Sequence, residues 1–266
     1  MSDTVLTAIA PDGVATITMI RPDVHNAFDE VLIADLTAAV RAIDADPAVR
    51  VIVLAAAGKS FSAGADLHWM KRMAAYTEAD NLRDALRLAD LMRTIDRAHK
   101  PTIARVQGAA FGGGVGLVAC CDLAIVAREA VFSLSEVRLG LIPAVISPYV
   151  VQAIGARASR RYFLTAERFT ADEALRLGLV TDVVDAEDID ARIQTLTGHL
   201  LKGGPQAIAA AKDLIRAVTD QPIETALVED TANRIARTRA GAEGREGIAA
   251  FLEKRPPAWV ASGAKS

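Results

Sequence analysis

The chain has 266 residues, which is enough for one large domain or for one domain with an appendage. Hydrophobic residues make up 52% of it and charged residues 24%, so the chain can bury a sizeable core and is not a disordered polypeptide. A net charge of -3 argues against nucleic acid as a partner bound through bulk positive charge.

The two cysteines, Cys120 and Cys121, are neighbours in the sequence. Adjacent cysteines rarely form a disulfide, so we interpret them as small core residues of a protein in a reducing compartment. Residues 1–4 carry no basic region followed by an apolar run, so no secretory signal is expected. No uncharged apolar run approaches the roughly 20 residues that cross a membrane. We therefore expect a cytoplasmic protein with no membrane partner.

The first half of the chain alternates between strand and helix patterns. Two predicted strands, 5–9 and 14–20, flank Pro11-Asp12-Gly13, a turn that joins them as a hairpin. The elements expected after the hairpin are helices over 29–44 and 78–98 and buried strands over 51–57 and 101–106. Each of these two strands ends in a turn of small residues that opens a helix.

The second half of the chain becomes almost entirely helical. Two short strands, 123–126 and 130–134, precede an irregular loop over 135–143. The pattern then predicts a strand over 179–184 and helices over 149–154, 157–164, 171–177, 189–201, 207–218, 225–237 and 243–251. The change from alternating elements to helices alone predicts a boundary near residue 190, between a core over 1–190 and a helical region over 191–266.

The two strand-to-helix turns are candidate functional features. One contains three consecutive glycines, Gly112, Gly113 and Gly114, each of which costs about 1 kcal/mol relative to alanine inside a helix. Glycines are favoured where the backbone turns sharply or a ligand approaches it closely, and the free N–H groups of a helix start attract negative charge. The other turn, residues 58–66, has a similar pattern. If the turns face each other, they aim two N–H groups at one point, as in an oxyanion hole.

Other kinds of site fit the sequence less well. Residues 114–119 match the G-x-G-x-x-A pattern of dinucleotide-binding proteins, with Glu136 near the expected acidic position. However, Asp122 begins the next strand too soon, because a crossover connection needs at least about 10–12 residues. Ser62 lies in a turn, but no G-x-S-x-G motif marks it as the nucleophile of a serine hydrolase. No Cys/His cluster or H-E-x-x-H spacing indicates a metal.

Glu136 is the strongest candidate for a catalytic residue. It follows two buried strands and lies in an apolar loop between Leu134 and Leu139. Burial there would raise the pKa of its carboxyl group towards neutral pH, which suits a general acid/base. The alternative is a structural carboxylate that pairs with Arg138 or with another arginine, and the spacing alone does not decide between the two.

Four motifs, in this order and spacing, give the chain a family resemblance. They are residues 60–67 (SFSAGADL), the triple glycine, residues 121–124 (CDLA) and residues 132–143 (FSLSEVRLGLIP). Together they resemble the crotonase (enoyl-CoA hydratase/isomerase) superfamily over nearly the whole chain. The resemblance implies an α/β fold, a crotonase-like spiral of ββα units with two nearly perpendicular sheets. It also implies an active site in the core and a C-terminal helical oligomerisation region, which forms a homotrimer or a dimer of trimers.

The resemblance further implies a substrate and the residues that bind it. The substrate would be an acyl-CoA thioester, so coenzyme A enters as part of the substrate and no metal or redox cofactor is needed. The backbone N–H groups of Ala65 and Gly113 would hold the thioester oxygen as it becomes an enolate, with Glu136 as the acid/base. The residues implied to line the CoA and acyl site are His25, Asn26, Ala27, Phe28, Ala63, Gly64, Asp66, Leu67, Gly112 and Gly116. Phe251 and Lys254 of a neighbouring subunit would contact the nucleotide end.

One position departs from the family pattern. Hydratases with two glutamates carry the first of them where this chain has Gly116. Hydration needs a base for water and an acid for the α-carbon, and two carboxylates divide that work. We expect a hydratase in which Glu136 does both jobs, or in which another group or the substrate's own carboxylate helps. The alternatives are a Δ3,Δ2-enoyl-CoA isomerase and a non-catalytic acyl-CoA-binding paralogue.

The sequence around Gly116 most resembles that of the bacterial methylglutaconyl-CoA hydratases, and it is also similar to that of the dehydratases that install β-branches in polyketides. Both groups act on branched acyl chains that bear a distal carboxylate. On this hypothesis, a glycine at position 116 leaves room for the branch and removes a negative charge that would repel the substrate. The candidate partners for the substrate carboxylate are Arg72, Arg83, Arg87 and Arg138.

Overall fold

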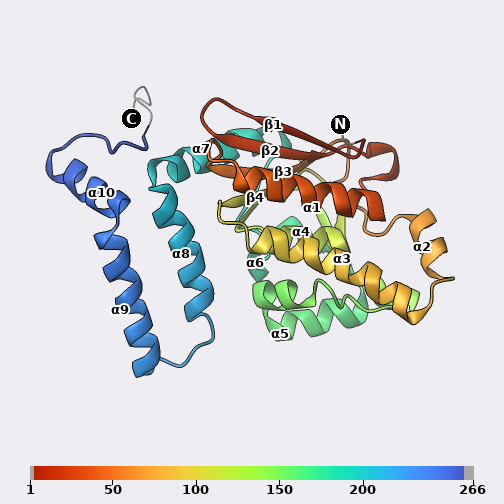
Figure 1. The fold of residues 1–266 in the computed structure, drawn as a ribbon. Helices are drawn as coiled ribbons and strands as arrows, with labels where there is room; N and C mark the ends of the chain where they lie inside the picture. Colours follow the sequence, from red (N-terminus) through yellow and green to blue (C-terminus); the bar gives the residue numbers. More distant parts are fainter. Residues whose placement is uncertain (1–2, 261–266) are drawn as a thin grey trace.

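The computed structural model describes residues 3–260, which fold as an α/β protein (Figure 1). The strands are β1 (Val5–Ile9), β2 (Val14–Met19), β3 (Val51–Ala56), β4 (Thr102–Val106), β5 (Ala110–Phe111), β6 (Leu123–Ala127), β7 (Val131–Ser133), β8 (Phe169–Thr170) and β9 (Asp182–Val184). The α-helices are α1 (Glu30–Ala45), α2 (Leu67–Met73), α3 (Glu78–Asp96), α4 (Gly113–Cys120), α5 (Ser147–Thr165), α6 (Ala171–Leu177), α7 (Ile189–Lys202), α8 (Pro205–Val218), α9 (Thr225–Ala240) and α10 (Ala242–Leu252). Short 3-10 helices are η1 (Pro22–Val24), η2 (Glu136–Leu139) and η3 (Ala186–Asp188).

A six-stranded sheet in the order β1-β2-β3-β4-β6-β9 forms the centre of the fold. The β1–β2 hairpin is antiparallel, and the other strand pairs of this sheet are parallel. Parallel sheets are usually covered on both faces, and β3 is accordingly buried along its whole length. Ile52 and Leu54 pack with α1, α3 and α4, whereas Val51 and Val53 pack with α7 on the opposite face.

A second, three-stranded sheet holds the triple glycine in place. Its order is β5-β7-β8, with β5 parallel to β7 and β8 antiparallel to β7. The rings of Phe132 and Phe169 stack with their centroids 5.5 Å apart, which ties β7 to β8. Because β5 runs almost directly into α4, this sheet fixes the point at which the triple glycine begins.

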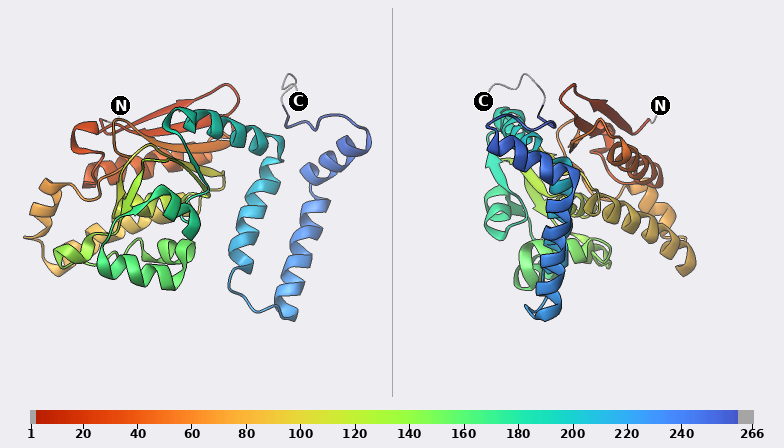
Figure 2. Two further views of the ribbon diagram at one scale, coloured as in Figure 1. Left: turned by 180° about the vertical axis from the view of Figure 1, so that it is seen from behind. Right: turned by 60° about the vertical axis from the view of Figure 1, so that its left-hand side comes forward.

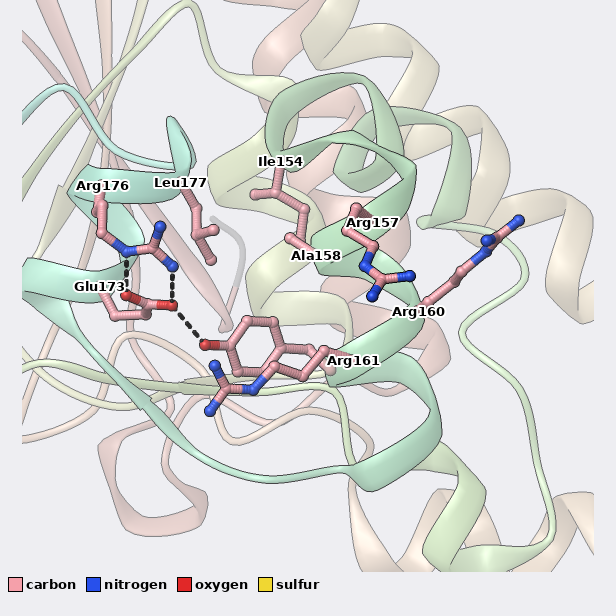
Figure 3. Close-up of a pocket in the computed structure, with 9 residues that line it drawn as sticks. Ile154, Arg157, Ala158, Arg160, Arg161, Glu173, Arg176 and Leu177 are labelled. Atoms are coloured by element: carbon pink, nitrogen blue, oxygen red, sulfur yellow. Dashed lines mark hydrogen bonds and ion pairs between the residues drawn. The ribbon is translucent and has the colours of Figure 1, made fainter.

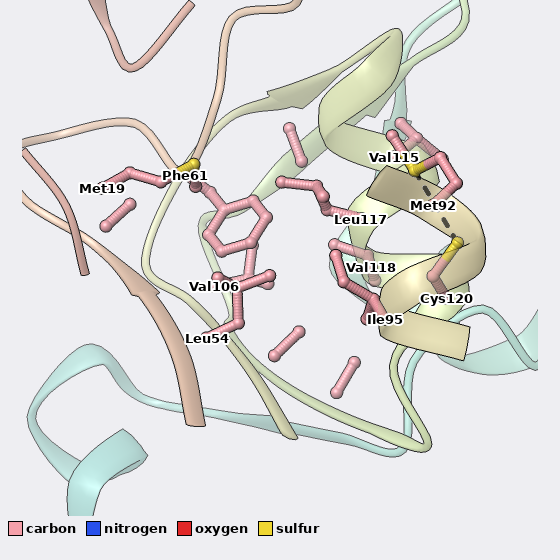
Figure 4. Packing of buried hydrophobic residues seen from close by; sticks show 14 of the residues in the cluster. Met19, Leu54, Phe61, Met92, Ile95, Val106, Val115, Leu117, Val118 and Cys120 are labelled. Carbon is pink, nitrogen blue, oxygen red and sulfur yellow. Dashed lines mark hydrogen bonds between the residues drawn. The ribbon is translucent and has the colours of Figure 1, made fainter. Parts of the chain in front are cut away.

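An apolar core lies between the six-stranded sheet and helices α3 and α4 (Figure 4). Phe61, which follows β3, is fully buried beside Leu54 and Val106. On the helical side, the Cys120 Sγ atom of α4 lies 3.7 Å from the Met92 Sδ atom of α3. Full burial of one large apolar side chain stabilises a fold by about 1.5–3 kcal/mol. These contacts therefore hold both glycine turns firmly against the sheet.

The C-terminal helices form an arm, and α9 and α10 stand apart from the core (Figure 1 and Figure 2). Helix α8 is tied to the core by an ion pair of 2.7 Å between Lys212 and Asp122. Neither α8 nor α9 contains a buried residue, and Ile223 and Phe251 are 87% and 82% exposed. By contrast, most of α7 falls on the C-terminal side of the predicted boundary, yet its Ile193 packs against the sheet. A large contiguous patch of exposed apolar side chains is typical of a surface that another molecule covers.

Most predicted elements agree with the structure, and the differences are the short strands β5 and β8, which were not predicted, and details near glycines. Helix α5 is interrupted at Gly155, with a φ of 74°, which agrees with the prediction of two shorter helices over 149–154 and 157–164. Helix α4 begins at Gly113, inside the triple glycine, because the turn is made by Gly112 alone, at a φ of 50°. No helix within residues 3–260 has the length and apolar character needed to cross a membrane.

Candidate active site

The structure brings the two glycine turns into contact. Phe111 N donates to Ser62 O at 2.9 Å, and Phe61 N donates to Ala109 O at 3.0 Å. Gly64 has a φ of 89°, and a Cβ atom built on it would lie 3.2 Å from Phe111 O. Residues with side chains rarely adopt that φ, so this close approach requires glycine. The two turns therefore lie side by side, which is the condition that an oxyanion hole between them requires.

The two N–H groups assigned to the oxyanion hole have no other acceptor. Neither Ala65 N nor Gly113 N donates a hydrogen bond within the described part of the chain. Gly113 is the first residue of α4, so its N–H is free of intrahelical bonding and lies where the helix dipole favours negative charge. Ala65 comes directly before Asp66, the N-cap of α2. Both N–H groups are thus available to an incoming oxygen atom, and their role as an oxyanion hole stays a prediction.

Glu136 begins η2, beside the triple glycine. Its Oε1 atom lies 3.1 Å from the point where a Cβ atom on Gly112 would stand. Its Oε2 atom is buried without a hydrogen-bond partner, and among residues 3–260 the carboxylate forms no ion pair. Removal from water raises the pKa of this carboxyl group above its ordinary value. The alternative of a structural pair with Arg138 is therefore not what the structure contains.

The predicted CoA-binding segment, residues 25–28, packs against the first glycine turn. Asn26 is fully buried, and its Nδ2 atom donates to Ser60 O at 3.0 Å. The His25 Nδ1 atom lies 3.1 Å from the Ser60 Oγ atom, and His25 O accepts from Ala63 N at 3.0 Å. Ala27 is buried as well. The side chain of Asn26 therefore holds the two segments together and is not available to a ligand.

Phe28 connects this segment to both N–H groups of the site. Its own N–H donates to Gly64 O at 2.7 Å, and its carbonyl accepts from Asp66 N at 2.8 Å, on either side of Ala65. Its ring is 1% exposed and lies over Gly113, where a Cβ atom would stand 2.9 Å from the Phe28 Cε2 atom. Phe28 thus fixes the backbone of the two turns relative to each other.

Arg21 holds two helix starts beside the site, a role that the sequence analysis missed. Its Nη2 atom lies 2.9 Å from Asp29 Oδ2 and 3.3 Å from Asp66 Oδ2, and its Nη1 atom donates to Ala27 O at 2.6 Å. Asp29 caps α1 and Asp66 caps α2. Burial raises the pKa of Asp66, but two backbone N–H groups of α2 and the charge of Arg21 outweigh it and lower the pKa below its ordinary value. In the sequence, Arg21 shows only as the residue before a proline that ends a strand.

The space beside Gly116 is filled. A Cβ atom at this position would lie 2.3 Å from the Ile146 Cγ2 atom and 3.2 Å from the Met92 Cε atom. Ile146 is the N-cap of α5 and is 3% exposed. The expectation that Gly116 leaves open room for a branched substrate was therefore wrong, because Ile146 occupies that room. Nothing in the spacing of the sequence marks Ile146, since it lies thirty residues along the chain from the glycine it contacts.

Three predicted contacts lie outside this cluster. Leu67 opens α2 directly after the first turn and is 79% exposed. Phe251 and Lys254 lie at the end of α10 and just beyond it, in the arm that stands apart from the core (Figure 1). A single chain does not bring these two residues to Glu136. Their contribution from a neighbouring subunit stays a prediction.

The four arginines suggested as partners for a substrate carboxylate differ in whether they already form an ion pair within this chain. Arg72, Arg83 and Arg87 each pair with a carboxylate of this chain. Arg138 is exposed, and its guanidinium has no partner within residues 3–260. It lies two residues after Glu136 in η2. Of the four, Arg138 is therefore the one that has an unpaired charge and also lies close to Glu136 in the sequence.

Other sites receive no support from the structure. Ser62 is fully buried, and its Oγ atom donates to Asn26 O at 2.9 Å, so it is not placed as a nucleophile. No group of three or more His, Cys, Asp and Glu side chains within the described residues is arranged to hold a metal ion.

A hollow of about 590 Å³ between α5 and α6 is rich in arginine but contains none of the predicted site residues (Figure 3). Within it, Glu173 accepts hydrogen bonds from Arg176 at 2.6 Å and from Tyr162 at 2.7 Å. These bonds lower the pKa of Glu173 to about 2, so this carboxylate stays ionised and paired. The hollow therefore offers no acid/base group like Glu136.

Known proteins share the sequence pattern and the fold. The family model described as Enoyl-CoA hydratase/isomerase matches residues 10–262. A crotonyl-CoA hydratase of Syntrophomonas wolfei is 33% identical over 238 residues, which cover 88% of this chain and 90% of that protein. The structure of an enoyl-CoA hydratase from Shewanella pealeana has a TM-score of 0.95 at 47% identity and covers 97% of both chains. Pseudomonas aeruginosa AtuE has a TM-score of 0.92 at 37% identity, covering 97% of this chain and 100% of that chain. The fold expected from the resemblance is thereby confirmed.

Proposed function

The chain belongs to the enoyl-CoA hydratase/isomerase family, and on that premise we propose that it adds water across the α,β double bond of an acyl-CoA thioester. Glu136 is the acid/base in this proposal, and the N–H groups of Ala65 and Gly113 are the oxyanion hole. His25 and residues 63–67 line the path of the CoA moiety in this proposal, and the buried Asn26, Ala27 and Phe28 hold that wall in place. Coenzyme A is part of the substrate, and acid/base chemistry with an N–H-stabilised enolate needs no metal or redox cofactor.

One observation carries the proposal: a partly buried carboxylate, whose Oε2 atom has no hydrogen-bond partner, stands against the backbone that offers two free N–H groups. The Glu136 Oε1 atom lies 3.1 Å from the Cβ position of Gly112, the residue before Gly113. Its unpartnered Oε2 atom and raised pKa are unfavourable for folding. Such a group is typical of a functional site, where strain is retained because the chemistry needs it.

In the proposed reaction, Glu136 first accepts a proton and then donates it, while the two N–H groups hold the thioester oxygen throughout. The N–H groups of Ala65 and Gly113 hold the thioester oxygen, which polarises the conjugated double bond. The Glu136 carboxylate takes a proton from water while the water oxygen bonds to the β-carbon, and the electron pair of the double bond passes to the enolate. The protonated Glu136 then delivers that proton to the α-carbon and returns to its starting state. The product is a 3-hydroxyacyl-CoA, and atoms and charge balance.

A second candidate is the Δ3,Δ2-enoyl-CoA isomerase, and the apolar packing at Gly116 favours it. Ile146 fills the place where a two-glutamate hydratase carries its first carboxylate. Isomerisation needs only one group that removes a proton from one carbon and returns it to another, which Glu136 alone provides. The two reactions differ in whether water enters the product, so product analysis separates them.

We propose a branched substrate with a distal carboxylate, such as 3-methylglutaconyl-CoA. Support comes from the similarity of residues 112–119 and 132–148 to methylglutaconyl-CoA hydratases and from the unpaired Arg138, which follows Glu136 by two residues in η2. The Arg138 guanidinium would pair with the distal carboxylate. Arg138→Met should raise the KM for 3-methylglutaconyl-CoA at least tenfold and leave the KM for crotonyl-CoA nearly unchanged, since a charge-assisted hydrogen bond is worth about 1.5–3 kcal/mol. Arg83→Met is the matched control, because Arg83 already pairs with a neighbouring carboxylate.

We also propose that residues 191–266 mediate assembly into a homotrimer or a dimer of trimers, and that Phe251 and Lys254 reach the CoA of a neighbouring subunit. The support is the apolar surface of the arm, where Ile223 is 87% exposed. Ile223→Asp should shift the sedimentation coefficient towards that of the monomer. Leu164→Asp on α5, where Leu164 is 74% exposed, should leave the assembly unchanged.

The proposed activity is tested by the loss of enoyl-thioester absorbance with crotonyl-CoA and 3-methylglutaconyl-CoA. Glu136→Gln should lower kcat at least a hundredfold, the lower range for loss of a general acid/base, while binding of the CoA esters is kept. Glu129→Gln, at an exposed position before β7, is the matched control and should keep full activity. Binding that persists with no turnover in the unmodified protein would instead support the non-catalytic paralogue.

A further inference from the structure

Gly116 lies one helical turn from Gly112, the glycine that faces the carboxylate of the site. Its N–H donates to Gly112 O at 3.2 Å, which places it one turn along α4 from the glycine beside Glu136. Helix α5, whose N-cap is Ile146, contacts both α4 and η2, the short helix that begins with Glu136. The residue that covers Gly116 therefore comes from an element that also packs against the glutamate of the site.

Two apolar side chains from different helices cover Gly116. The Ile146 Cγ2 and Cβ atoms lie 2.3 and 2.9 Å from its Cβ position, and the Met92 Cε atom lies at 3.2 Å. Met92, on α3, is held by a contact with Cys120, which lies on α4 as Gly116 does (Figure 4). Real Cβ atoms are almost never closer than 3.0 Å to such neighbours, so no side chain fits at position 116 while Ile146 stays in place. The glycine and the isoleucine are therefore complementary.

We propose that Ile146, paired with Gly116, is a specificity-determining residue that limits the group carried by the β-carbon of the acyl chain. The inference rests on the proposed function, which places the thioester oxygen at Gly113 and the double bond beside Glu136. From Gly113, the acyl group has to pass the next turn of α4, where Ile146 stands. Its branched apolar side chain presents a wall where a two-glutamate hydratase carries its first carboxylate, and on this proposal the wall accommodates a β-methyl group and excludes a larger one.

Ile146→Ala tests this wall through a change of substrate preference. The substrates are 2-enoyl-CoA esters whose β-carbon carries, besides its methyl group, a hydrogen, a second methyl or an ethyl group. Truncation should raise the ratio of kcat/KM for the ethyl ester over that for the dimethyl ester about tenfold, the usual range for one methylene in an apolar pocket. Ile154→Ala is the matched control, because Ile154 is a buried isoleucine of the same helix that lines the arginine-rich hollow instead. It should leave the ratio unchanged.

A second measurement tests the pairing without activity. Gly116→Ala should lower the midpoint of urea unfolding strongly in the natural background, because the new methyl group meets Ile146. In the Ile146→Ala background the same change should lower the midpoint much less, since truncation opens the space. Equal shifts in the two backgrounds would overturn the pairing.

The outcomes distinguish this inference from the proposed function. An unmodified protein that consumes none of the three esters and no 3-methylglutaconyl-CoA would overturn the proposed function and the inference with it. An active protein whose ester ratio does not change in Ile146→Ala, or changes equally in Ile154→Ala, would overturn the inference and leave the proposed function standing.

Discussion

Replacing Arg21 by methionine should destabilise the fold and slow the reaction, because one guanidinium holds two helix starts beside the N–H of Ala65. The side chains of Arg21 and Asp66 are 19% and 7% exposed, so this ion pair is largely buried. Removing one partner of a fully buried pair costs about 3–5 kcal/mol. Partial contact of the arginine with water reduces this to roughly 2–3 kcal/mol. Methionine keeps much of the length of the side chain, so the loss reports mainly on charge and hydrogen bonds.

The dependence of this loss on pH identifies its cause. The pKa of Asp66 is lowered in the folded state, so its contribution is present above the unfolded-state pKa and is lost as the pH falls through the folded-state value. The difference in free energy of unfolding between the unmodified protein and Arg21→Met should therefore be full at pH 7. It should narrow as the pH falls below about 4, near the ordinary pKa of an aspartate.

Urea unfolding between pH 3 and pH 7 measures this difference, with Arg41→Met as the matched control. The side chains of Arg41 and Asp90 are 57% and 36% exposed, so breaking that pair should cost less than about 1 kcal/mol. Turnover of crotonyl-CoA should fall about tenfold or more in Arg21→Met alone, because a small displacement of Ala65 moves an N–H away from the thioester oxygen. Equal losses in the two variants, or a loss in Arg21→Met that is constant with pH, would refute the reasoning.

Three further predictions concern stability. Glu136→Gln should raise the free energy of unfolding by about 1 kcal/mol at pH 7, because it removes a charge from a partly buried carboxylate whose Oε2 atom has no hydrogen-bond partner. The folded-state pKa of Glu136 is raised, so this gain should be absent below about pH 4 and grow as the pH rises, and urea unfolding that gives the same gain throughout would contradict it. Gly108→Ala should cost at least about 2 kcal/mol in thermal unfolding, because its Cβ atom would lie 2.0 Å from Lys59 O, and an unchanged Tm would contradict this. Gly198→Ala should instead raise the stability by up to about 1 kcal/mol, since no atom lies within 4 Å and alanine favours the helix α7, and a loss would count against this account of α7.

A strand or helix can be predicted from the sequence wherever its own residues show the hydrophobic period or the turn residues of that element. The hairpin around Gly13 and the fully apolar strand at Val51 are visible in the sequence because turn chemistry and burial act on adjacent residues. The two-residue strands β5 and β8 were not predicted, since each is defined by its pairing with the distant strand β7. Tertiary pairing of this kind leaves no periodic signal in so short a segment.

The residues of the candidate site likewise fall into two groups, those that the sequence reveals and those that only the folded structure reveals. Glu136 and the glycine turns are recognisable because their residue types are unusual in their places and carry the chemistry themselves. Arg21 and Ile146 act on residues 45 and 30 positions away, Asp66 and Gly116, so only the folded chain reveals them. The meaning of Gly116 also changed with the structure. A missing side chain suggests open space in a sequence, whereas packing shows that another side chain has taken it.

The central claim is that Glu136 adds water to an enoyl-CoA, and the most direct measurement is mass spectrometry of the product formed in water labelled with heavy oxygen. Crotonyl-CoA and 3-methylglutaconyl-CoA would be incubated with the unmodified protein and with Glu136→Gln. The account predicts a 3-hydroxyacyl-CoA that carries one labelled oxygen on the β-carbon, formed by the unmodified protein and not by the variant. A product without label, or labelled product formed equally by Glu136→Gln, would contradict it.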